Sequence, residues 1–576
     1  MNGTSIKDPV RTELPRRGSF WPAAKPRLAL FGLLLAGLVA LGYVRIDPAA
    51  MLASRANAVN FFNRVGALSF PGATDLLYQT ALTLGIVLLG TLLAGVLSVP
   101  VAFLAARNTA PGRSAQVIGR AIGVLARATP DVVLAMVFAL MFSLGALPGI
   151  MAIGLHSVGM ISRLFADAIE QIDSGPRLAV RACGAGRLQE LTAGVLPQVM
   201  PSWLATTLHR ADINLRGSVI LGYVGVPGLG MEMRNAFGAL NYSRGLAIAV
   251  VIFGLCLGME ALSSTLRRRM LGAAPVKASR PAAARAAPTP SAAQCVVTRS
   301  AGQPSSTKSV APDLGRYLER PWDGQRVKRL AGWCTAGFAL AGALVVCQIN
   351  LTDFVTVWSH LPPVLDKMWP PTAGAYGIWR LLGALMATVA VAFAAALMTL
   401  LASLIIGSLA ARNVASRPST RNFWRATLVV IRGIPELVLG IVLIVVTGLG
   451  AQAGTLALAF CHIGLLGKLM ADSFEELPAG PQRALTAAGA GRLQMYVAGV
   501  LAPGRQAVVG HALYVLDTNI RAATLLGMVG GGGIGYYLLV AGQGSNYGQV
   551  TLIVAMIVAV VMALEGLTVW LRRTLA

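Results

Sequence analysis

The six residues GAGRLQ occur twice in this chain, at residues 184–189 and again at residues 489–494, a separation of 305 residues. The same separation relates further matched features, which are LAARN at Leu104 and Leu409, Pro130 and Pro435, Asp212 and Asp517, Gly230 and Gly535, and Arg268 and Arg573. A short solenoid repeat would have a period of about 20 to 50 residues. The sequence therefore describes one long unit written twice and predicts a fused dimer.

Composition limits what this unit can be. Of the 576 residues, 55% are hydrophobic and only 12% are charged, which excludes an ordinary soluble enzyme and indicates a polytopic membrane protein. The net charge of +25 comes from Lys and Arg placed between apolar runs, a pattern typical of the positive-inside rule rather than of nucleic-acid binding. The six cysteines form no CxxC pair and no metal-like spacing with the five histidines, so we expect no metal site.

The first apolar run of each copy predicts a membrane helix. In the first copy it covers residues 28–44 and follows a basic start, so a cleaved signal peptide is the alternative interpretation. The second copy has a comparable run at residues 330–349, where no signal peptide could act. This internal counterpart favours a membrane helix in both copies.

Five more spans are expected in each copy. Residues 76–106 are uncharged and exceed the roughly 20 residues needed to cross the hydrocarbon core. The arginine-rich segment that follows is expected in the cytoplasm, and residues 132–162 are expected to form a helical hairpin broken near Leu147-Pro148-Gly149. The last two spans are expected near residues 203–222 and 246–266.

The predicted fold is an all-α polytopic membrane protein with about 12 transmembrane helices in two parallel six-helix repeats. An even number of spans returns each repeat to the cytoplasm, so both termini are expected there, in a bacterial inner membrane. The expected parts are a cytoplasmic tail (1–27), a first repeat (28–270, core about 77–268), a disordered cytoplasmic linker (271–328) and a second repeat (329–576, core about 382–573).

The GAGRLQ loops resemble a known element. Residues 174–201 and 479–506 each combine an Ala-rich turn, a glycine, and a hydrophobic residue followed by proline, a pattern similar to the EAA loop of ABC importer permeases. That resemblance implies a short helix parallel to the membrane that docks in a cleft of the ATPase. The expected docking residues are Ala182, Gly184, Ala185, Gly186, Ala487, Gly489, Ala490 and Gly491.

The wider pattern resembles the phosphonate importer permeases and implies their type I fold. LAARN, a Pro-acid helix start, acids at the end of span four, Asp-x-Asn-x-Arg, and GYVGVPGLG or GMVGGGGIG appear in this order twice. The acid that opens the family's loop is replaced by Leu178 and Arg483, so an ion pair from that position to the ATPase is in doubt.

The Asp-x-Asn-x-Arg sets are the candidate translocation residues: Asp212, Asn214, Arg216, Asp517, Asn519 and Arg521. An acid four residues before an arginine shares its helix face. Each charge at mid-membrane could cost about 2.5 to 3.5 kcal/mol, so such residues normally face the bundle interior or a water-filled path. A salt bridge that only fixes span five is the alternative, and the two are compatible.

Two further matched features have plainer interpretations. Glu260 and Glu565 are expected to pair with a nearby arginine rather than touch substrate. The glycine runs at residues 222–230 and 527–535 follow no strand and belong to no P-loop, so they predict a tight turn between spans five and six.

The resemblance implies a permease, not an enzyme, that imports a phosphorus oxyanion. It implies two ATPase subunits that hold ATP and Mg, and a periplasmic substrate-binding protein, with no cofactor in this chain; contacts with membrane lipid and none with nucleic acid are expected. A secondary transporter driven by an ion gradient, a permease for another small solute and a membrane scaffold are the alternatives. Phosphonate, phosphite and hypophosphite remain open as substrates.

Overall fold

The computed structural model describes residues 20–46, 49, 54–142, 145–270, 324–350 and 352–575, and this described part is helical with no strand. Seven of its helices are long and apolar enough to cross a membrane alone, and three pairs of bent helices raise that number to ten. Helix α1 adds a shorter apolar helix (Leu28–Val44), and α10 occupies the place that α22, part of the third bent pair, has in the second repeat. The predicted linker lies outside the described residues, except that its last five residues begin α14.

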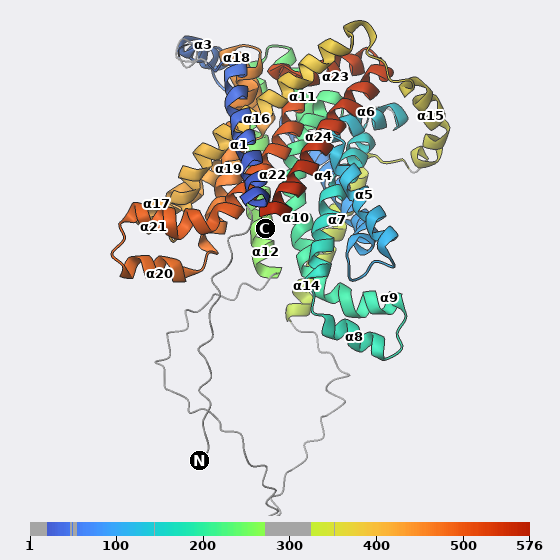
Figure 1. Ribbon diagram of the computed structural model, residues 1–576. Coiled ribbons are helices and arrows are strands. Elements are labelled where there is room, and N and C mark those ends of the chain that lie inside the picture. The colour runs from blue at the N-terminus through green and yellow to red at the C-terminus, as the bar shows by residue number, and fades with distance from the viewer. Residues whose placement is uncertain are drawn as a thin grey trace, which may run out of the picture.

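The helices of the first repeat are α1 (Phe20–Val44), α3 (Arg55–Val65), α4 (Ala73–Ala105), α5 (Arg113–Ala128), α6 (Asp131–Phe142), α7 (Ala146–Glu170), α8 (Ser174–Ala182), α9 (Arg187–Gln189), α10 (Leu196–Leu221), α11 (Leu229–Gly238) and α12 (Tyr242–Met270). Those of the second are α14 (Gly324–Cys347), α15 (Asp353–Met368), α16 (Ile378–Ala410), α17 (Pro418–Gly433), α18 (Glu436–Thr447), α19 (Ala451–Glu475), α20 (Ala479–Ala487), α21 (Arg492–Tyr496), α22 (Ala502–Leu526), α23 (Ile534–Gln543) and α24 (Tyr547–Leu575). Figure 1 shows one bundle of long helices, with α8 and α9 on one side and α20 and α21 on the opposite side of its lower end, called here the loop end.

Several paired helices have bounds that differ by the repeat separation alone. Helices α4 and α16 each have 33 residues and match at both ends, as do α6 with α18 and α7 with α19. At about 1.5 Å per residue, 33 residues extend well beyond a hydrocarbon core of about 30 Å. The duplication in sequence is therefore a duplication in structure.

A sharp bend separates α5 from α6 and α17 from α18. The axes turn by 88° and 82° at Thr129-Pro130 and Ile434-Pro435. Thr129 and Ile434 are extended, because a following proline disfavours the helical conformation of the residue before it. Each bend leaves an acidic residue as the first residue of the next helix.

Glycines let α7 lie very close to its neighbours. A Cβ atom on Gly90 of α4 would lie 2.9 Å from Ile153, and one on Gly154 of α7 would lie 2.7 Å from Leu93. Small residues allow such close helix packing in membranes, where lipid supplies little hydrophobic driving force. The glycines in the sequence therefore allow the close contact between α4 and α7.

The first helix of each repeat packs on the other repeat. Helix α1 lies against α16, where Gly37 faces Leu397. Helix α14 lies against α4, where Cys347 and Ala343 face Gly85. This exchange ties the repeats together, and Ala40 of α1 is buried.

Two connections differ from what the sequence predicts. The hairpin breaks before Ala146, so Pro148 lies in the first turn of α7, where its missing N–H needs no partner. The arginine-rich segment forms helix α5, which makes one bent candidate span with α6. The glycine run leads into the ten-residue helix α11, and Gly225 and Gly228, with φ of 93° and 133°, form the turn before it.

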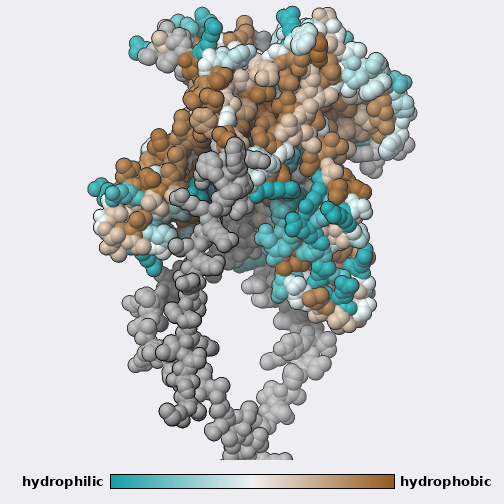
Figure 2. Space-filling model, viewed as in Figure 1, coloured by the Kyte–Doolittle hydropathy of each residue, from teal (hydrophilic) through white to brown (hydrophobic). Residues whose placement is uncertain are grey.

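The surface agrees with a membrane protein. Figure 2 shows a broad hydrophobic band over the bundle and hydrophilic side chains gathered toward its ends. Exposed apolar side chains such as Leu92, Ile405 and Val250 belong to the long helices. A contiguous apolar surface of this kind fits contact with lipid.

Candidate functional site

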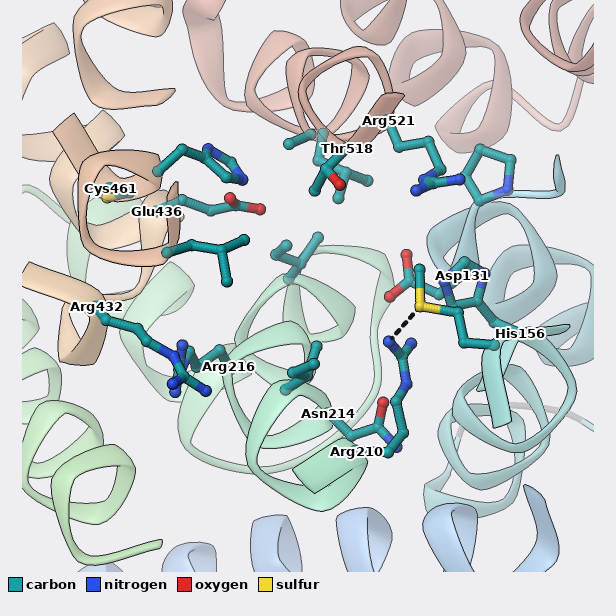
Figure 3. A pocket seen from close by; sticks show the side chains of 18 of the residues that line it. Asp131, His156, Arg210, Asn214, Arg216, Arg432, Glu436, Cys461, Thr518 and Arg521 are labelled. Carbon is teal, nitrogen blue, oxygen red and sulfur yellow. Dashed lines mark hydrogen bonds between the residues drawn. The ribbon is translucent and has the colours of Figure 1, made fainter. Parts of the chain in front are cut away.

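A cavity of about 230 Å³ lies between the two repeats. The first repeat lines it from α6, α7 and α10, and the second from α17, α18, α19 and α22. A cavity needs roughly 10–15 Å³ to hold one water, so this one has room for a hydrated small solute. Figure 3 shows that charged side chains from both repeats point into it.

Arg216 of α10 enters the cavity from the first repeat. Its Nη2 lies 2.6 Å from Oδ2 of Asp212, so the expected pair four residues apart is present. The same Oδ2 accepts a hydrogen bond of 3.1 Å from Nη2 of Arg432, on α17 of the other repeat. The Asp212 side chain is only 1% exposed, and two guanidinium groups share it.

Arg521 of α22 enters the cavity from the second repeat. Its Nη2 lies 2.9 Å from Oδ2 of Asp517. Asp517 does not line this cavity but a neighbouring one, together with Arg127 and Glu565. Asn519 is fully buried behind the wall, and its Nδ2 donates to the Ala392 carbonyl at 3.4 Å.

The six candidate translocation residues therefore divide into two groups. Arg216, Arg521 and Asn214 line the cavity, whereas Asp212, Asp517 and Asn519 do not. Asn214 is held in place, because its Nδ2 donates to Thr91 Oγ1 at 2.9 Å and its Oδ1 accepts from Ser157 Oγ at 3.0 Å.

Glu260 and Glu565 pair with arginines, and in both cases the arginine belongs to the other repeat. Arg432 Nη2 lies 3.1 Å from Glu260 Oε2, and Arg127 pairs with Glu565. Arg127 and Arg432 occupy matching positions at the ends of α5 and α17.

Close backbone packing fixes where these two arginines lie. A Cβ on Gly159 of α7 would lie 2.6 Å from the Arg127 nitrogen, and one on Gly464 of α19 would lie 2.7 Å from the Arg432 nitrogen. Because no larger residue fits at either glycine, each arginine is held at the boundary between the repeats.

The structure adds cavity residues that sequence reasoning missed. Arg210 of α10 donates from Nε to Ser157 Oγ at 2.9 Å and from Nη1 to Met160 Sδ at 3.0 Å. Among the described residues, no carboxylate lies within 4 Å of it. The residue 305 positions later is Val515, so a search for matched pairs could not find Arg210, although a charge in an apolar helix was a signal.

Asp131 and Glu436 also line the cavity. They are the acids of the two Pro-acid helix starts, and they occupy the first position of α6 and of α18. The sequence showed the motif but not that both carboxylates face one cavity (Figure 3).

The two GAGRLQ loops have the same conformation. Gly184 and Gly489 have φ of 78° and 75°, in the left-handed region that favours glycine. They follow the short helices α8 and α20, which end at Ala182 and Ala487. The Gly186 N–H donates to Gln189 Oε1 at 3.0 Å, and the matching bond in the second loop is 2.9 Å.

Within each GAGRLQ stretch, one large apolar side chain is exposed. Leu188 is 75% exposed and Leu493 is 74% exposed. Both lie at the loop end of the molecule (Figure 1). The first loop is also braced by an ion pair between Arg177 and Glu190, whereas the second has Gln482 and Met495 at those positions.

The duplication is matched by a family of transport proteins. The family described as binding-protein-dependent transport system inner membrane component matches residues 98–272 and, a second time, residues 403–576. The chain belongs to this family. The permease is therefore a multi-pass inner membrane component of an ABC transporter and not an enzyme, and its family works with ATPase and substrate-binding partners. This finding sets aside the secondary transporter and the scaffold.

Named relatives agree with this assignment. The permease is 37% identical over 545 residues to the phosphate-import permease protein PhnE of Mycolicibacterium smegmatis, covering 94% of this chain and 93% of that protein. It is 39% identical to the phosphite transport system permease protein PtxC of Stutzerimonas stutzeri, over 32% of this chain and 68% of that one. It is also 34% identical to the putative cryptic phosphonate transport system permease protein PhnE2 of Escherichia coli K12, over 21% and 99% of the two chains. The first match spans both repeats.

Proposed function

We propose that the permease imports a small tetrahedral phosphorus oxyanion through the cavity between its repeats. The observation that carries the proposal is the set of arginines that enter this cavity from both repeats: Arg210, Arg216, Arg432 and Arg521. The named relatives support the substrate class, because their names specify phosphate, phosphite and phosphonate. These anions share three or more oxygens around phosphorus, which guanidinium groups bind with charge-assisted hydrogen bonds.

Arg216 and Arg521 are proposed as the central anion contacts. Among the described residues, Arg216 Nε and Arg521 Nη1 are buried and have no hydrogen-bond partner. An unmet buried donor is costly, and an oxyanion oxygen would satisfy it. Asp212 and Asp517 each hold one guanidinium in position and offset its charge when no anion is present.

This arrangement allows passage rather than tight binding. A charge in the membrane interior is costly unless it is paired, so an anion needs cationic partners along its way. Because Arg216, Arg432 and Arg521 are already paired with carboxylates, the incoming anion must compete for them, and the net gain on binding stays moderate. A transport path requires moderate affinity, since the anion must also leave.

The GAGRLQ loops are proposed as the docking sites of two ATPase subunits, which hold ATP and Mg. Their shared conformation, their place at one end of the molecule and the exposed Leu188 and Leu493 support this role. The binding protein would then dock on the opposite end, and both termini would lie in the cytoplasm, in agreement with the positive-inside pattern. One chain would replace two permease subunits.

Reconstitution tests the proposal. The permease, its ATPase and its binding protein in proteoliposomes should take up radiolabelled phosphate only when ATP is present, and unlabelled phosphite or methylphosphonate should compete. Arg521→Gln should lower uptake at least about tenfold, which corresponds to about 1.4 kcal/mol. ATP-dependent uptake of a neutral or cationic solute, with no phosphorus compound competing, would exclude the proposed substrate class.

A further inference from the structure

Two carboxylates face the arginine-lined cavity and have no evident place in anion transport. Asp131 begins α6 and Glu436 begins α18, each directly after the proline at a helix bend. The first turn of a helix favours a negative side chain, which explains why these positions tolerate an acid. It does not explain why the acids point into a cavity meant for anions.

Neither carboxylate is neutralised by an ion pair. Among the described residues, no Lys, Arg or His nitrogen lies within 4 Å of Asp131 or Glu436. In the part of the chain that the structure describes, the one hydrogen bond to either acid is local, from the Val132 N–H to Asp131 Oδ1 at 3.0 Å. By contrast, Asp212 and Asp517 are held by arginines. The two cavity acids thus keep acceptor oxygens available.

The cavity contains two similar groups of residues, each drawn from both repeats (Figure 3). One group has Asp131 with Arg210 and Arg521. The other has Glu436 with Arg216 and Arg432. Arg521 and Arg216 match by the repeat separation, and so do the two acids. Each half-site therefore offers several N–H donors and one carboxylate acceptor.

We propose that Asp131 and Glu436 select for an oxyanion that carries a P–OH group, and thereby exclude sulfate. While it is ionised, a carboxylate only accepts hydrogen bonds. A phosphate monoester has its second pKa near about 6, so phosphorus oxyanions of this type keep a hydroxyl donor in part of their population near neutral pH. Sulfate has no such donor. A sulfate oxygen next to the carboxylate would place two hydrogen-bond acceptors together with no hydrogen between them.

The proposal rests on the proposed function, since it assigns a selectivity to the same cavity. The discrimination comes from a repulsive element, not from additional attraction, because the arginines alone would bind sulfate and phosphate alike. Without the acids, the cavity would be a general anion site. With them, it accepts an anion that is both acceptor and donor.

Equilibrium binding to the full-length permease in lipid nanodiscs tests the selectivity without the binding protein. Radiolabelled inorganic phosphate is the probe, and unlabelled phosphate and sulfate are the competitors. For the wild type, phosphate should displace the probe at concentrations at least tenfold below those of sulfate. In Asp131→Asn combined with Glu436→Gln, the amides can donate to sulfate, and this ratio should fall to near one.

Asp366→Asn is the matched control, because it makes the same chemical change at an exposed position of α15 outside the cavity and should keep the wild-type ratio. If the acids only balance charge, the double variant would bind both anions more tightly with an unchanged ratio, and the selectivity proposal would fall while the proposed function stands. A wild type that retains no phosphate at millimolar concentrations would instead contradict the cavity as an oxyanion site, and with it the proposed function.

Discussion

Asp212 and Asp517 occupy the same position in the two repeats but have different surroundings. Asp212 is 1% exposed and is shared by Arg216 and Arg432. Asp517 is 19% exposed and pairs with Arg521 alone, because the counterpart of Arg432, Arg127, pairs with Glu565 instead. The shared Asp-x-Asn-x-Arg pattern thus gives the same ion pair within each helix, whereas the contacts between helices differ.

The two repeats therefore differ in the ion pairs behind the cavity wall, although the matched acids Asp131 and Glu436 and the matched arginines Arg216 and Arg521 all line the cavity. Lys468 lies 3.8 Å from Glu260, whereas no basic residue other than Arg127 is recorded beside Glu565 among the described residues. The charged residues around Asp212 and Glu260 therefore form one connected network. Those around Asp517 and Glu565 form two separate ion pairs. The two walls of the cavity should respond differently to the same change.

The largest expected effect is the loss of Arg432. Arg432→Ala leaves Asp212 and Glu260 to share Arg216, so the buried cluster loses one positive charge, and removing one partner of a buried ion pair costs up to about 3–5 kcal/mol. Arg127→Ala strands only Glu565, in a somewhat more exposed place, and should cost about half as much or less. The midpoints of thermal unfolding in detergent measure the difference, and equal midpoints would show that the network adds nothing to the simple pair.

Next in size is the effect of the exposed leucines in the GAGRLQ loops. Leu188→Asp and Leu493→Asp should each weaken association with the ATPase by about 2 kcal/mol, roughly thirtyfold, as expected for an interface anchor. Because the Arg177–Glu190 ion pair braces the first loop, this loop should be better ordered than the second loop when no ATPase is bound. Pull-down of the ATPase gives the readout, with Leu92→Asn on the lipid-facing surface as a control for general damage.

Exchanging the charges of one pair separates an anion contact from a structural bridge. In the first repeat, Asp212→Arg would place a new guanidinium beside Arg432, so the exchange is a clean test only in the second repeat. Asp517→Arg with Arg521→Asp should fold, because polar contacts in membranes contribute only about 0.6 kcal/mol on average. It should transport at least about tenfold less than the wild type.

Substrate uptake per molecule of correctly folded protein distinguishes an anion contact from a structural bridge. Full transport by the exchanged pair would leave the structural bridge as the sufficient explanation. Arg521→Lys is the companion variant, and it should retain part of the activity because it keeps the positive charge but loses the planar pair of donors.

The smallest expected effect belongs to Lys468. Its side chain is 40% exposed and 3.8 Å from Glu260, so the pair is worth about 0–1 kcal/mol. Lys468→Ala should change neither the unfolding midpoint nor uptake beyond error. A large loss of stability or uptake would mean that the network depends on Lys468, its most exposed member. The distinction between one connected network and separate ion pairs would then be wrong.

Local features were predictable from the sequence, and contacts between distant segments were not. The long apolar runs gave the spans, and the four-residue spacing gave the Asp212–Arg216 and Asp517–Arg521 pairs. Hydrophobicity alone could not show that α1 packs on the other repeat, because an apolar helix can pack on any apolar neighbour. Arg432 and Asp212 are 220 residues apart, and no periodicity relates them.

The sequence contains signals for the helix bends and for the cavity residues, but these signals do not specify the structure by themselves. Pro130 and Pro435 marked an interruption, but whether a proline kinks, ends or redirects a helix depends on what packs around it. The acids after them were seen only as helix starts. Arg210 was missed because the search relied on matched pairs, and its counterpart is Val515.

Arg210 has no arginine counterpart in the second repeat, and this matters for how the permease can evolve. In a permease made of two identical subunits, any codon change appears twice in the assembled pore, so a substitution useful on one wall is imposed on the other. Joining the halves in one gene removes this constraint, so Arg210 can line the cavity while Val515, at the equivalent position, is buried in the core of the second repeat. A fused gene can therefore change the two walls of the pore one residue at a time.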